Sequence, residues 1–335
     1  MQRAIDLAQR GIGQVEPNPR VGCVIVHDNR IIGEGYHQMY GGPHAEVQAL
    51  NSVAKADKHL LPDATLYVTL EPCAHEGKTP PCAHRIVQEK VGHVVIATLD
   101  PHDKVAGQGK AILEAAGTPL TMGILEKAAQ AINRPFFTQH TQHRPYVTLK
   151  WAQSRDGFLG EIGKRTALTG AIANRITHRW RVEHKAILVG QETARIDNPR
   201  LTNHLWPGPT PLRIVWDPDG SLPDDLQVWD GQADTWVLTH DSRTSHPNAV
   251  IQVVPQDHWV DSVQAMLIKA GIQSVLVEGG SKTLHAFLTA GWWDEYRVWQ
   301  SPQWLGDGVP APILPMPPVH EEQIGSDLLM TGYRA

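Results

Sequence analysis

Four residues near the start of the chain have the types and spacing of a hydrolytic metal site. His44 and Glu46 stand two apart in "GGPHAEVQAL", and Cys73 and Cys82 follow in "LEPCAHEGKTPPC". One imidazole and two thiolates are typical zinc ligands, and three ligands leave the fourth tetrahedral position to a water that ionises near pH 7. A nearby carboxylate can carry that water's proton to a leaving amine, as in zinc base deaminases. The pattern therefore predicts a zinc site with Glu46 as the proton-transfer group.

The small number of cysteines supports the assignment of two of them to zinc. Three cysteines are too few for a disulfide framework, so in a reducing compartment Cys73 and Cys82 are better explained as metal ligands. Cys23, within the apolar run "VGCVIV", is predicted to be a small buried side chain.

Each of the three ligands directly follows a proline. Because proline suits the first turn of a helix, we expect each ligand where a loop meets a helix start, whose partial positive charge favours thiolates.

A structural zinc site is the main alternative. Such a site needs a fourth protein ligand, which His75 or His84 could supply. The eight residues between Cys73 and Cys82 also depart from the two residues that usually separate the cysteines of a deaminase. The glutamate two residues after the histidine favours the catalytic alternative.

Length and composition place these motifs in a chain of two domains. The 335 residues are enough for two domains of ordinary size. All three cysteines precede residue 83 and all eleven tryptophans follow residue 150, which indicates two separately built cores. We expect domains at residues 1–140 and 145–335, with the polar stretch "TQHTQHRP", residues 138–145, as the linker.

Both halves predict an alternation of strands and helices. In the first half the strand-like runs are "VGCVIV", "ATLYVTLEP" and "HVVIATLD", with helical patterns at 2–11, 44–56, 82–90 and 108–116. In the second half they are "PYVTLKWAQS", "KAILVG", "LRIVWD", "TWVLTH", "SVLVEGG" and "EYRVWQ", with helices near 171–183, 261–271 and 282–290. This order predicts an α/β fold for each domain, a sheet with helices packed over it.

A strand, two glycines and a helix, "SVLVEGGSKTLHAFL", form the segment of the second half best suited to binding. Glycines allow close backbone approach and a helix start offers N–H donors, so residues 278–284 could hold the phosphates of a cofactor. An ordinary strand-to-helix connection is the alternative. Arg181, in "HRWRVEHK", offers a guanidinium that binds phosphate bidentately, or else belongs to a solvated basic helix face.

Charge and hydropathy narrow the class of partner. The formal net charge is −5, and neither half has the basic excess expected of a nucleic-acid or anionic-membrane partner. No segment approaches the roughly 18 to 20 apolar residues of a membrane helix, and the start "MQRAIDLAQRG" lacks the apolar core of a signal peptide. We expect a cytoplasmic protein that acts on a small molecule.

The motifs together resemble one enzyme family. "PNPRVGCVIV", "GGPHAEVQAL", "TLEPCAHEGKTPPC" and "ATLDPHDKVAGQG" look like the deaminase half of the bifunctional riboflavin-biosynthesis deaminase-reductases, in which the longer cysteine spacing is usual. "LKWAQSRDG", "AILVGQETARIDNPRLT", "PLRIVWD" and "VLVEGG" look like the reductase half. The resemblance covers nearly the whole chain. It implies a cytidine-deaminase-like α/β/α zinc domain followed by a dihydrofolate-reductase-like α/β domain.

The resemblance also implies two reactions and their cofactors. The first is zinc-dependent hydrolytic deamination of 2,5-diamino-6-(5-phosphoribosylamino)pyrimidin-4-one. The second is NADPH-dependent reduction of the ribosyl side chain of the product to ribityl. We therefore expect Zn²⁺ and NADPH as cofactors, a phosphorylated pyrimidine as substrate, and a homo-oligomer, either dimer or tetramer.

Positions in the second half follow from the same resemblance. The cofactor positions are Ala152, Thr193, Asp197, Gly280, Ser281, Lys282, Thr283 and Leu284. The substrate positions are Lys150, Asp156, Arg165, Arg181, Leu201, His204 and Glu278. Two of these depart from the family: Arg165 begins Arg-Thr-Ala where many relatives have Ser-x-Trp, and His204 stands where they have arginine.

Three other functions are compatible with parts of the pattern. A nucleic-acid or free-nucleoside deaminase with an unrelated tail predicts a basic face or stacking aromatics around the zinc motif, and residues 1–140 show neither strongly. A zinc-stabilised module that binds a pterin- or flavin-like ligand predicts binding without turnover. A chain with one active domain is the third, and the departures at 165–167 and 204 give a reason to test it.

Overall fold

The chain divides into two compact units, Met1–Arg144 and Pro145–Ala335. The structure, a computed structural model, describes residues 1–74, 81–102 and 106–334. The stretch 138–145, expected as a linker, is largely helical, because α6 (Arg134–Gln142) runs through it. Proline in the first turn starts this helix, and Phe136 and Thr138 are buried, so one face packs on its own unit despite the polar sequence.

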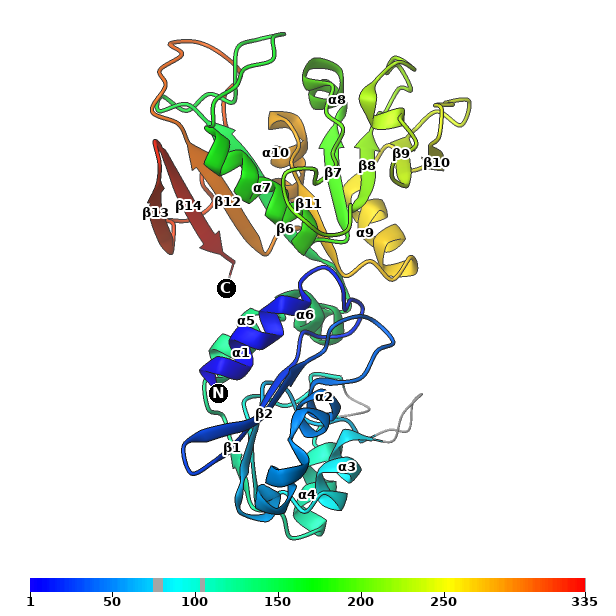
Figure 1. The fold of residues 1–335 in the computed structure, drawn as a ribbon. Helices are drawn as coiled ribbons and strands as arrows, with labels where there is room; N and C mark the ends of the chain where they lie inside the picture. Colours follow the sequence, from blue (N-terminus) through cyan, green and yellow to red (C-terminus); the bar gives the residue numbers. More distant parts are fainter. Residues whose placement is uncertain (75–80, 103–105, 335) are drawn as a thin grey trace. The chain divides into compact units, whose positions relative to one another are not determined.

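The first unit is a five-stranded sheet with helices on both faces (Figure 1). The strand order is β2-β1-β3-β4-β5, in which β1 is antiparallel to both neighbours and the other pairs are parallel. The strands are β1 (Gly22–His27), β2 (Arg30–Tyr36), β3 (Thr65–Val68), β4 (His93–Ile96) and β5 (Leu120–Met122). The helices, besides α6, are α1 (Gln2–Ala8), α2 (Ala45–Ser52), α3 (Cys82–Gln88), α4 (Gln108–Ala115) and α5 (Glu126–Ala131). Buried side chains of α2, α3 and α4 form the core on one face, and those of α1 pack on the other.

The hairpin of β1 and β2 lets α2 lie close to this sheet. Asp28 and Asn29 form its two-residue turn at φ of 47° and 61°, left-handed values that Asp and Asn tolerate. A Cβ at Gly33 or Gly35 of β2 would lie 2.6 or 2.5 Å from backbone atoms of Ala49 in α2. Because these positions are glycines, α2 packs directly on the strand, and its first turn carries part of the metal motif.

The second unit is a nine-stranded sheet in the order β10-β9-β8-β7-β11-β6-β12-β14-β13. Neighbouring strands from β10 to β12 are parallel, and β14 and β13 pair antiparallel at one side. The strands are β6 (Tyr146–Gln153), β7 (Ala186–Gly190), β8 (Leu212–Trp216), β9 (Thr235–Thr239), β10 (Val250–Val253), β11 (Ser274–Val277), β12 (Glu295–Gln300), β13 (His320–Ile324) and β14 (Asp327–Tyr333).

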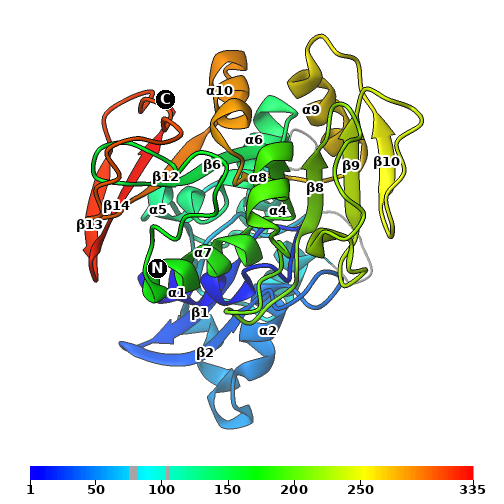
Figure 2. The same cartoon turned by 90° about the horizontal axis from the view of Figure 1, so that it is seen from above.

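Helices cover both faces of this second sheet (Figure 2). The helices α7 (Ala171–Glu183) and α8 (Gln191–Asp197) lie on one face, and α9 (Trp259–Lys269) and α10 (Ser281–Ala290) on the other. Successive strand residues point to opposite faces, so in β7 Ile187 and Val189 pack with Ala194 of α8, whereas Leu188 packs with Leu284 of α10. The parallel strands end at one edge, where an open α/β sheet forms its binding crevice.

Candidate active sites

The three predicted metal ligands converge in the first unit. The ligand atoms of His44, Cys73 and Cys82 all lie within 4.8 Å of one another. His44 Nδ1 is 3.5 Å from the Sγ of Cys73 and 3.4 Å from the Sγ of Cys82. A tetrahedral zinc with ordinary bond lengths separates nitrogen and sulfur by about 3.6 Å. The donor set and its spacing therefore fit zinc.

Two of these ligands lie at helix starts. His44 is the N-cap of α2, and Cys82 is the first residue of α3 after Pro81. Cys73 lies in the loop after β3, and because residues 75–80 are outside the described part of the chain, the expected helix start there stays a prediction. The backbone N–H of Cys82 nevertheless donates to Cys73 Sγ over 3.3 Å. Hydrogen bonding with Cys82, and then with His44, lowers the pKa of Cys73 against the effect of burial.

A fourth protein ligand is not found in the described part of the chain. Among those residues, only His44, Cys73 and Cys82 form a group of metal-binding side chains around this point. His84 lies on α3 with an exposed side chain and is not part of the group. His75 lies outside the described residues. Within the described residues, the cluster therefore has the three-ligand composition of a catalytic zinc site.

Glu46 lies in the first turn of α2 and is 3 % exposed. Burial raises its pKa to about 7, and the negative charge of Cys73 adds to this effect. A hydrogen bond with the Cys82 side chain lowers the pKa of Glu46 and so opposes these two effects. This contact shows that the carboxyl group lies beside the ligand cluster. A carboxyl group with such a pKa can both take up and release a proton near neutral pH.

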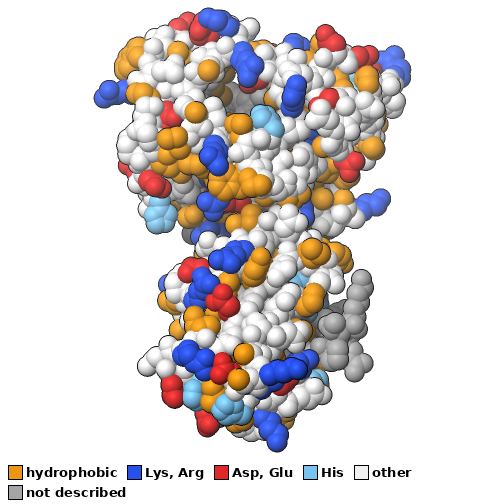
Figure 3. All heavy atoms as spheres, viewed as in Figure 1, with side chains coloured by type: hydrophobic (Ala, Val, Ile, Leu, Met, Phe, Trp, Pro, Cys, Tyr) orange, Lys and Arg blue, Asp and Glu red, His pale blue; other side chains and the backbone are white. Residues whose placement is uncertain are grey.

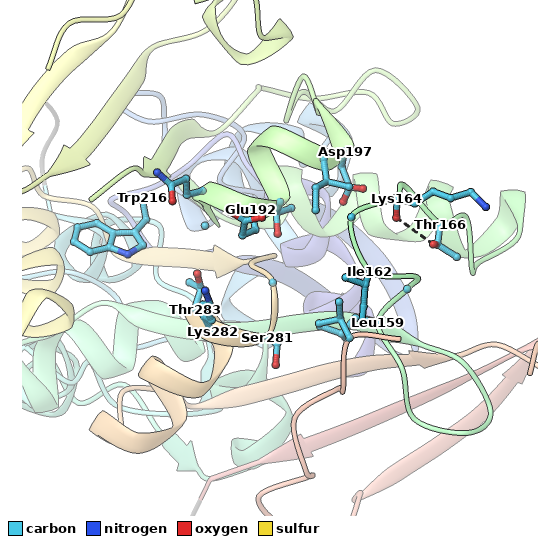
Figure 4. A pocket seen from close by; sticks show the side chains of 18 of the residues that line it. Leu159, Ile162, Lys164, Thr166, Glu192, Asp197, Trp216, Ser281, Lys282 and Thr283 are labelled. Carbon is cyan, nitrogen blue, oxygen red and sulfur yellow. Dashed lines mark hydrogen bonds between the residues drawn. The ribbon is translucent and has the colours of Figure 1, made fainter. Parts of the chain in front are cut away.

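In the second unit a cavity of about 670 Å³ follows the carboxyl edge of the sheet (Figure 4). The loop 159–164, the start of α8, the end of β8 and the starts of α9 and α10 line it. Six predicted cofactor residues are among the lining residues: Thr193, Asp197, Gly280, Ser281, Lys282 and Thr283. The other two are not: Ala152 is half-buried on β6, and Leu284 is fully buried in the core.

Closely packed glycines shape the middle of this cavity. Gly190 and Gly280 are the N-caps of α8 and α10. A Cβ at Gly190 would lie 2.2 Å from Thr283 Oγ1, and one at Gly280 would lie 3.0 Å from Thr193 Oγ1. The two helix starts therefore meet with the side chains of Thr193 and Thr283 packed against the glycine backbone. The N–H groups at the start of α10 form a cradle that fits the phosphates of a nucleotide cofactor.

Three predicted substrate residues form one half-buried ionic cluster. Arg181 Nε and Nη2 donate to the two carboxylate oxygens of Glu278 at 2.9 and 3.0 Å, and Lys150 Nζ lies 3.8 Å from Glu278. Burial alone would raise the pKa of Glu278, but Arg181 and Lys150 outweigh it and lower that pKa to about 2. Arg181 Nη1 donates to the Thr202 carbonyl at 2.8 Å. The bidentate side of Arg181 thus faces Glu278, and only its remaining N–H groups are left for a phosphate.

The other substrate positions have separate surroundings. Leu201 is 2 % exposed, with φ of 56°. His204 Nδ1 lies 3.1 Å from Thr202 Oγ1, and its ring is an edge-on neighbour of His178 with the centroids 4.4 Å apart. Asp156 accepts the N–H groups of the loop residues at 305 and 306, at 3.1 and 2.7 Å, so it holds that loop. Arg165 is exposed and acts electrostatically on Asp197.

Several lining residues were not predicted from the sequence. Trp216, Trp259, Gln191 and Glu192 line the cavity beside the predicted positions. Trp216 ends an apolar strand, so its place at the carboxyl edge was a signal that sequence reasoning could have used. Trp259 is the first residue of α9, and its place at the cavity depends on how α9 packs against the sheet, which no local sequence pattern indicates.

The surface and the helices add two observations. Basic and acidic side chains are interspersed on the face shown in Figure 3. Within the described residues, no helix combines the length and apolar character needed to cross a bilayer.

Fold and sites together define a zinc deaminase domain joined to a reductase domain with a nucleotide-binding edge. Residues 1–98 match the cytidine and deoxycytidylate deaminase zinc-binding region, and residues 145–327 match the RibD C-terminal domain. The chain belongs to the RibD family, the bifunctional deaminases and reductases of riboflavin biosynthesis. These matches confirm the family resemblance and the predicted order of the two folds.

Individual relatives match almost the whole chain. The riboflavin biosynthesis protein RibD of Aquifex aeolicus is 36 % identical, over 98 % of this chain and 96 % of its own. That of Bacillus amyloliquefaciens is 39 % identical, over 94 % and 86 %. The crystal structure of a diaminohydroxyphosphoribosylaminopyrimidine deaminase/5-amino-6-(5-phosphoribosylamino)uracil reductase from Thermotoga maritima has a TM-score of 0.92 at 36 % identity, covering 100 % of this chain and 97 % of that one. Acinetobacter baumannii RibD has a TM-score of 0.86 at 33 % identity, covering 98 % and 96 %.

Proposed function

We propose that this chain deaminates 2,5-diamino-6-(5-phosphoribosylamino)pyrimidin-4-one and then reduces the ribosyl group of the product to ribityl with NADPH. The observation that carries the proposal is the His44, Cys73 and Cys82 cluster beside the buried Glu46. The Thermotoga maritima protein, whose structure matches over the full chain, is described as acting on these pyrimidines. A cytoplasmic location and a homo-oligomer, dimer or tetramer, belong to the same proposal.

In the deaminase domain the protein's own part is proton transfer. His44, Cys73 and Cys82 would hold zinc, which when bound supplies a Lewis acid that makes water a nucleophile near neutral pH. Glu46 would accept a proton from the attacking water and deliver it to the departing 2-amino group, so that water is consumed and ammonia is released. The raised pKa of Glu46 supports this role, because the group can hold the proton between the two transfers.

In the reductase domain the protein's part is to position two ligands. NADPH, when bound, supplies the hydride for C1 of the ribosyl group. Gly280 to Thr283, with Thr193, would hold the cofactor phosphates at the helix starts. The substrate would lie against the Lys150, Arg181 and Glu278 cluster, with Asp197 between cluster and cofactor.

The two departures from the family concern the substrate end. We propose that His204, packed beside His178, contributes to the phosphate site in place of arginine. Arg165 would act through Asp197, which it influences electrostatically. If these replacements fail, the reductase half is inactive and the chain is a deaminase alone.

The decisive experiment measures the two reactions separately. The zinc-loaded protein is incubated with the diaminopyrimidine phosphate, with and without NADPH, and ammonia release and NADPH oxidation are followed. Both activities are supported if ammonia is released without NADPH and if NADPH, when present, is oxidised after the ammonia release. Ammonia release alone supports the single-domain alternative. Tight substrate binding with neither product would support a zinc-stabilised binding module and overturn the proposal.

A further inference from the structure

One end of the reductase cavity is formed by two stacked indoles. Trp216, the last residue of β8, and Trp259, the first of α9, both line the cavity. Their ring centroids are 4.2 Å apart and their planes differ by 8°. His240 meets Trp216 edge-on at 4.9 Å, and Phe287 meets Trp259 edge-on at 5.8 Å. The indole of Trp216 is therefore held in place by aromatic neighbours before any ligand binds.

The opposite end of the cavity adjoins the substrate cluster. Figure 4 shows Asp197, Lys164 and Thr166 at that end and Trp216 at the other. Asp197 acts electrostatically on Lys150, which in turn lies 3.8 Å from Glu278. The ionic cluster is thus reached from the Asp197 end.

The phosphate cradle lies between the two ends. Gly190 and Gly280 begin α8 and α10, and Thr283 packs against Gly190. In the sheet, β8 is separated from β11 by β7, and β6 lies on the far side of β11. Along the edge the order is therefore the indoles after β8, the cradle after β7 and β11, and the ionic cluster built around β6 and β11.

This order fixes the direction of a dinucleotide cofactor. A hydride donor must place its nicotinamide ring against the substrate, so that ring belongs at the Asp197 end. Its pyrophosphate fits the central cradle. The adenine base is then left at the end formed by Trp216. We infer that Trp216, backed by Trp259, is the surface on which the adenine base of the cofactor stacks, an inference that rests on the proposed reductase function.

Stacking on an indole makes a clear prediction for affinity. Base–aromatic stacking is worth enough that its removal weakens binding about tenfold or more. Trp259 covers one face of Trp216 and limits its freedom, so little side-chain ordering accompanies binding. Trp216→Leu should lose the stacking face, and Trp216→Phe should keep most of it.

The test separates the two halves of the cofactor. Calorimetry and tryptophan fluorescence follow binding of NADP⁺, adenosine 2′,5′-bisphosphate and nicotinamide mononucleotide to the full chain. Trp216→Leu is expected to weaken the first two ligands about tenfold or more, and nicotinamide mononucleotide by less than about twofold. Trp304→Leu is the matched control, since Trp304 is 72 % exposed and is not among the lining residues. It should bind all three ligands as the unaltered chain does.

Three further results would overturn the inference in distinguishable ways. If the unaltered chain binds NADP⁺ but Trp216→Leu binds adenosine 2′,5′-bisphosphate equally well, the stacking surface is wrong and the reductase proposal survives. If the unaltered chain binds none of the three ligands, the stacking inference and the reductase proposal both fail. Thermal unfolding checks that the variants are folded, and equal loss of affinity in folded Trp216→Phe and Trp216→Leu would also contradict stacking.

Discussion

Glu46 and Glu278 are both buried carboxyl groups, yet their surroundings prepare them for opposite tasks. Glu46 has the negative charge of Cys73 nearby, and burial raises its pKa to about 7. The Glu278 side chain is nearly as buried, but Arg181 and Lys150 lower its pKa to about 2. A group that titrates near neutral pH can transfer protons, whereas a permanently charged group can only orient and bind. The two residues therefore suit a hydrolytic site and a binding cluster respectively.

The first prediction at this scale concerns Glu46. Glu46→Gln keeps the size of the side chain but removes its ability to carry a proton. Ammonia release should fall by about a hundredfold or more, while bound zinc, measured by metal analysis, stays at the level of the unaltered chain. NADPH oxidation with the deaminated pyrimidine serves as the control and should not change. Full ammonia release at full zinc content would exclude the proton-transfer role.

The second prediction compares two arginines of the same helix. Arg181→Ala leaves Glu278 buried without its bidentate partner, so the second unit should lose about 3 kcal/mol of stability and the KM for the phosphorylated substrate should rise. Arg179→Ala removes a contact with the Trp206 ring and a pair with Glu183, which keeps its pair with Arg297, so it should cost less than about 1 kcal/mol. Chemical unfolding and reductase kinetics measure both variants. Equal behaviour of the two variants would contradict the cluster's importance.

At the scale of elements, helix starts meeting at strand ends shape the reductase edge. The Cβ that Gly190→Ala would add lies 2.2 Å from Thr283 Oγ1 but 3.4 Å from Thr283 Cβ. The single substitution should therefore destabilise the protein by about 1 to 3 kcal/mol and weaken cofactor binding. Adding Thr283→Ala removes the clashing oxygen, so the double variant should regain stability relative to Gly190→Ala alone. Additive losses in a double-mutant cycle of unfolding would disprove this contact.

The end of α7 provides a pH-dependent prediction. His184 caps this helix, with Nδ1 2.7 Å from the Trp180 carbonyl and Nε2 2.8 Å from Thr148 Oγ1. Burial, aided by Arg297, lowers its pKa from 6.5 to about 4. Between pH 6.5 and 4 the unfolded chain takes up a proton that the folded chain does not, so stability falls as the pH falls, by up to about 1.4 kcal/mol per unit.

His184→Gln tests this directly. Glutamine does not titrate, so the variant should lose less stability than the unaltered chain between pH 6.5 and 4. Denaturant unfolding of the full chain at several pH values measures the slope. His285→Gln, at an exposed position of α10, is the control and should keep the original slope. An unchanged slope in His184→Gln would show that this histidine titrates alike in both states.

At the scale of the whole molecule, each unit contains its own core and its own site. The zinc ligands all belong to Met1–Arg144, and the cavity and ionic cluster all belong to Pro145–Ala335. Metal binding should therefore stabilise one unit without supporting the other.

Metal removal gives the last prediction. Dialysis against a chelator should abolish ammonia release and lower the unfolding temperature of the first unit, because zinc binds only the folded arrangement of ligands. Oxidation of NADPH with the deaminated pyrimidine should continue at its original rate. Differential scanning calorimetry and the two activity assays measure these effects. Loss of both activities on chelation would contradict independent sites.

The sequence by itself determined the local chemistry of this protein. His44 and the two cysteines were predictable because zinc ligation demands particular residue types, and Glu46 because a zinc-activated water needs a carboxylate to carry its proton. Strands such as β7 and β11 were predictable because sheets covered on both faces need continuous apolar runs. Elements without that signal were missed: β13 (His320–Ile324) is polar and exposed, and α6 presents a polar sequence with few buried residues.

Only the tertiary structure decided which distant residues meet. Arg181 and Glu278 lie 97 residues apart, and their pairing depends on α7 packing beside the end of β11. The stack of Trp216 on Trp259 depends in the same way on the position of α9 relative to β8. Residue periodicity reports how each segment is buried, but strand order and helix placement determine which segments share a site. For that reason the metal site could be predicted from the sequence, whereas the ionic cluster and the indole pair could be found only in the folded structure.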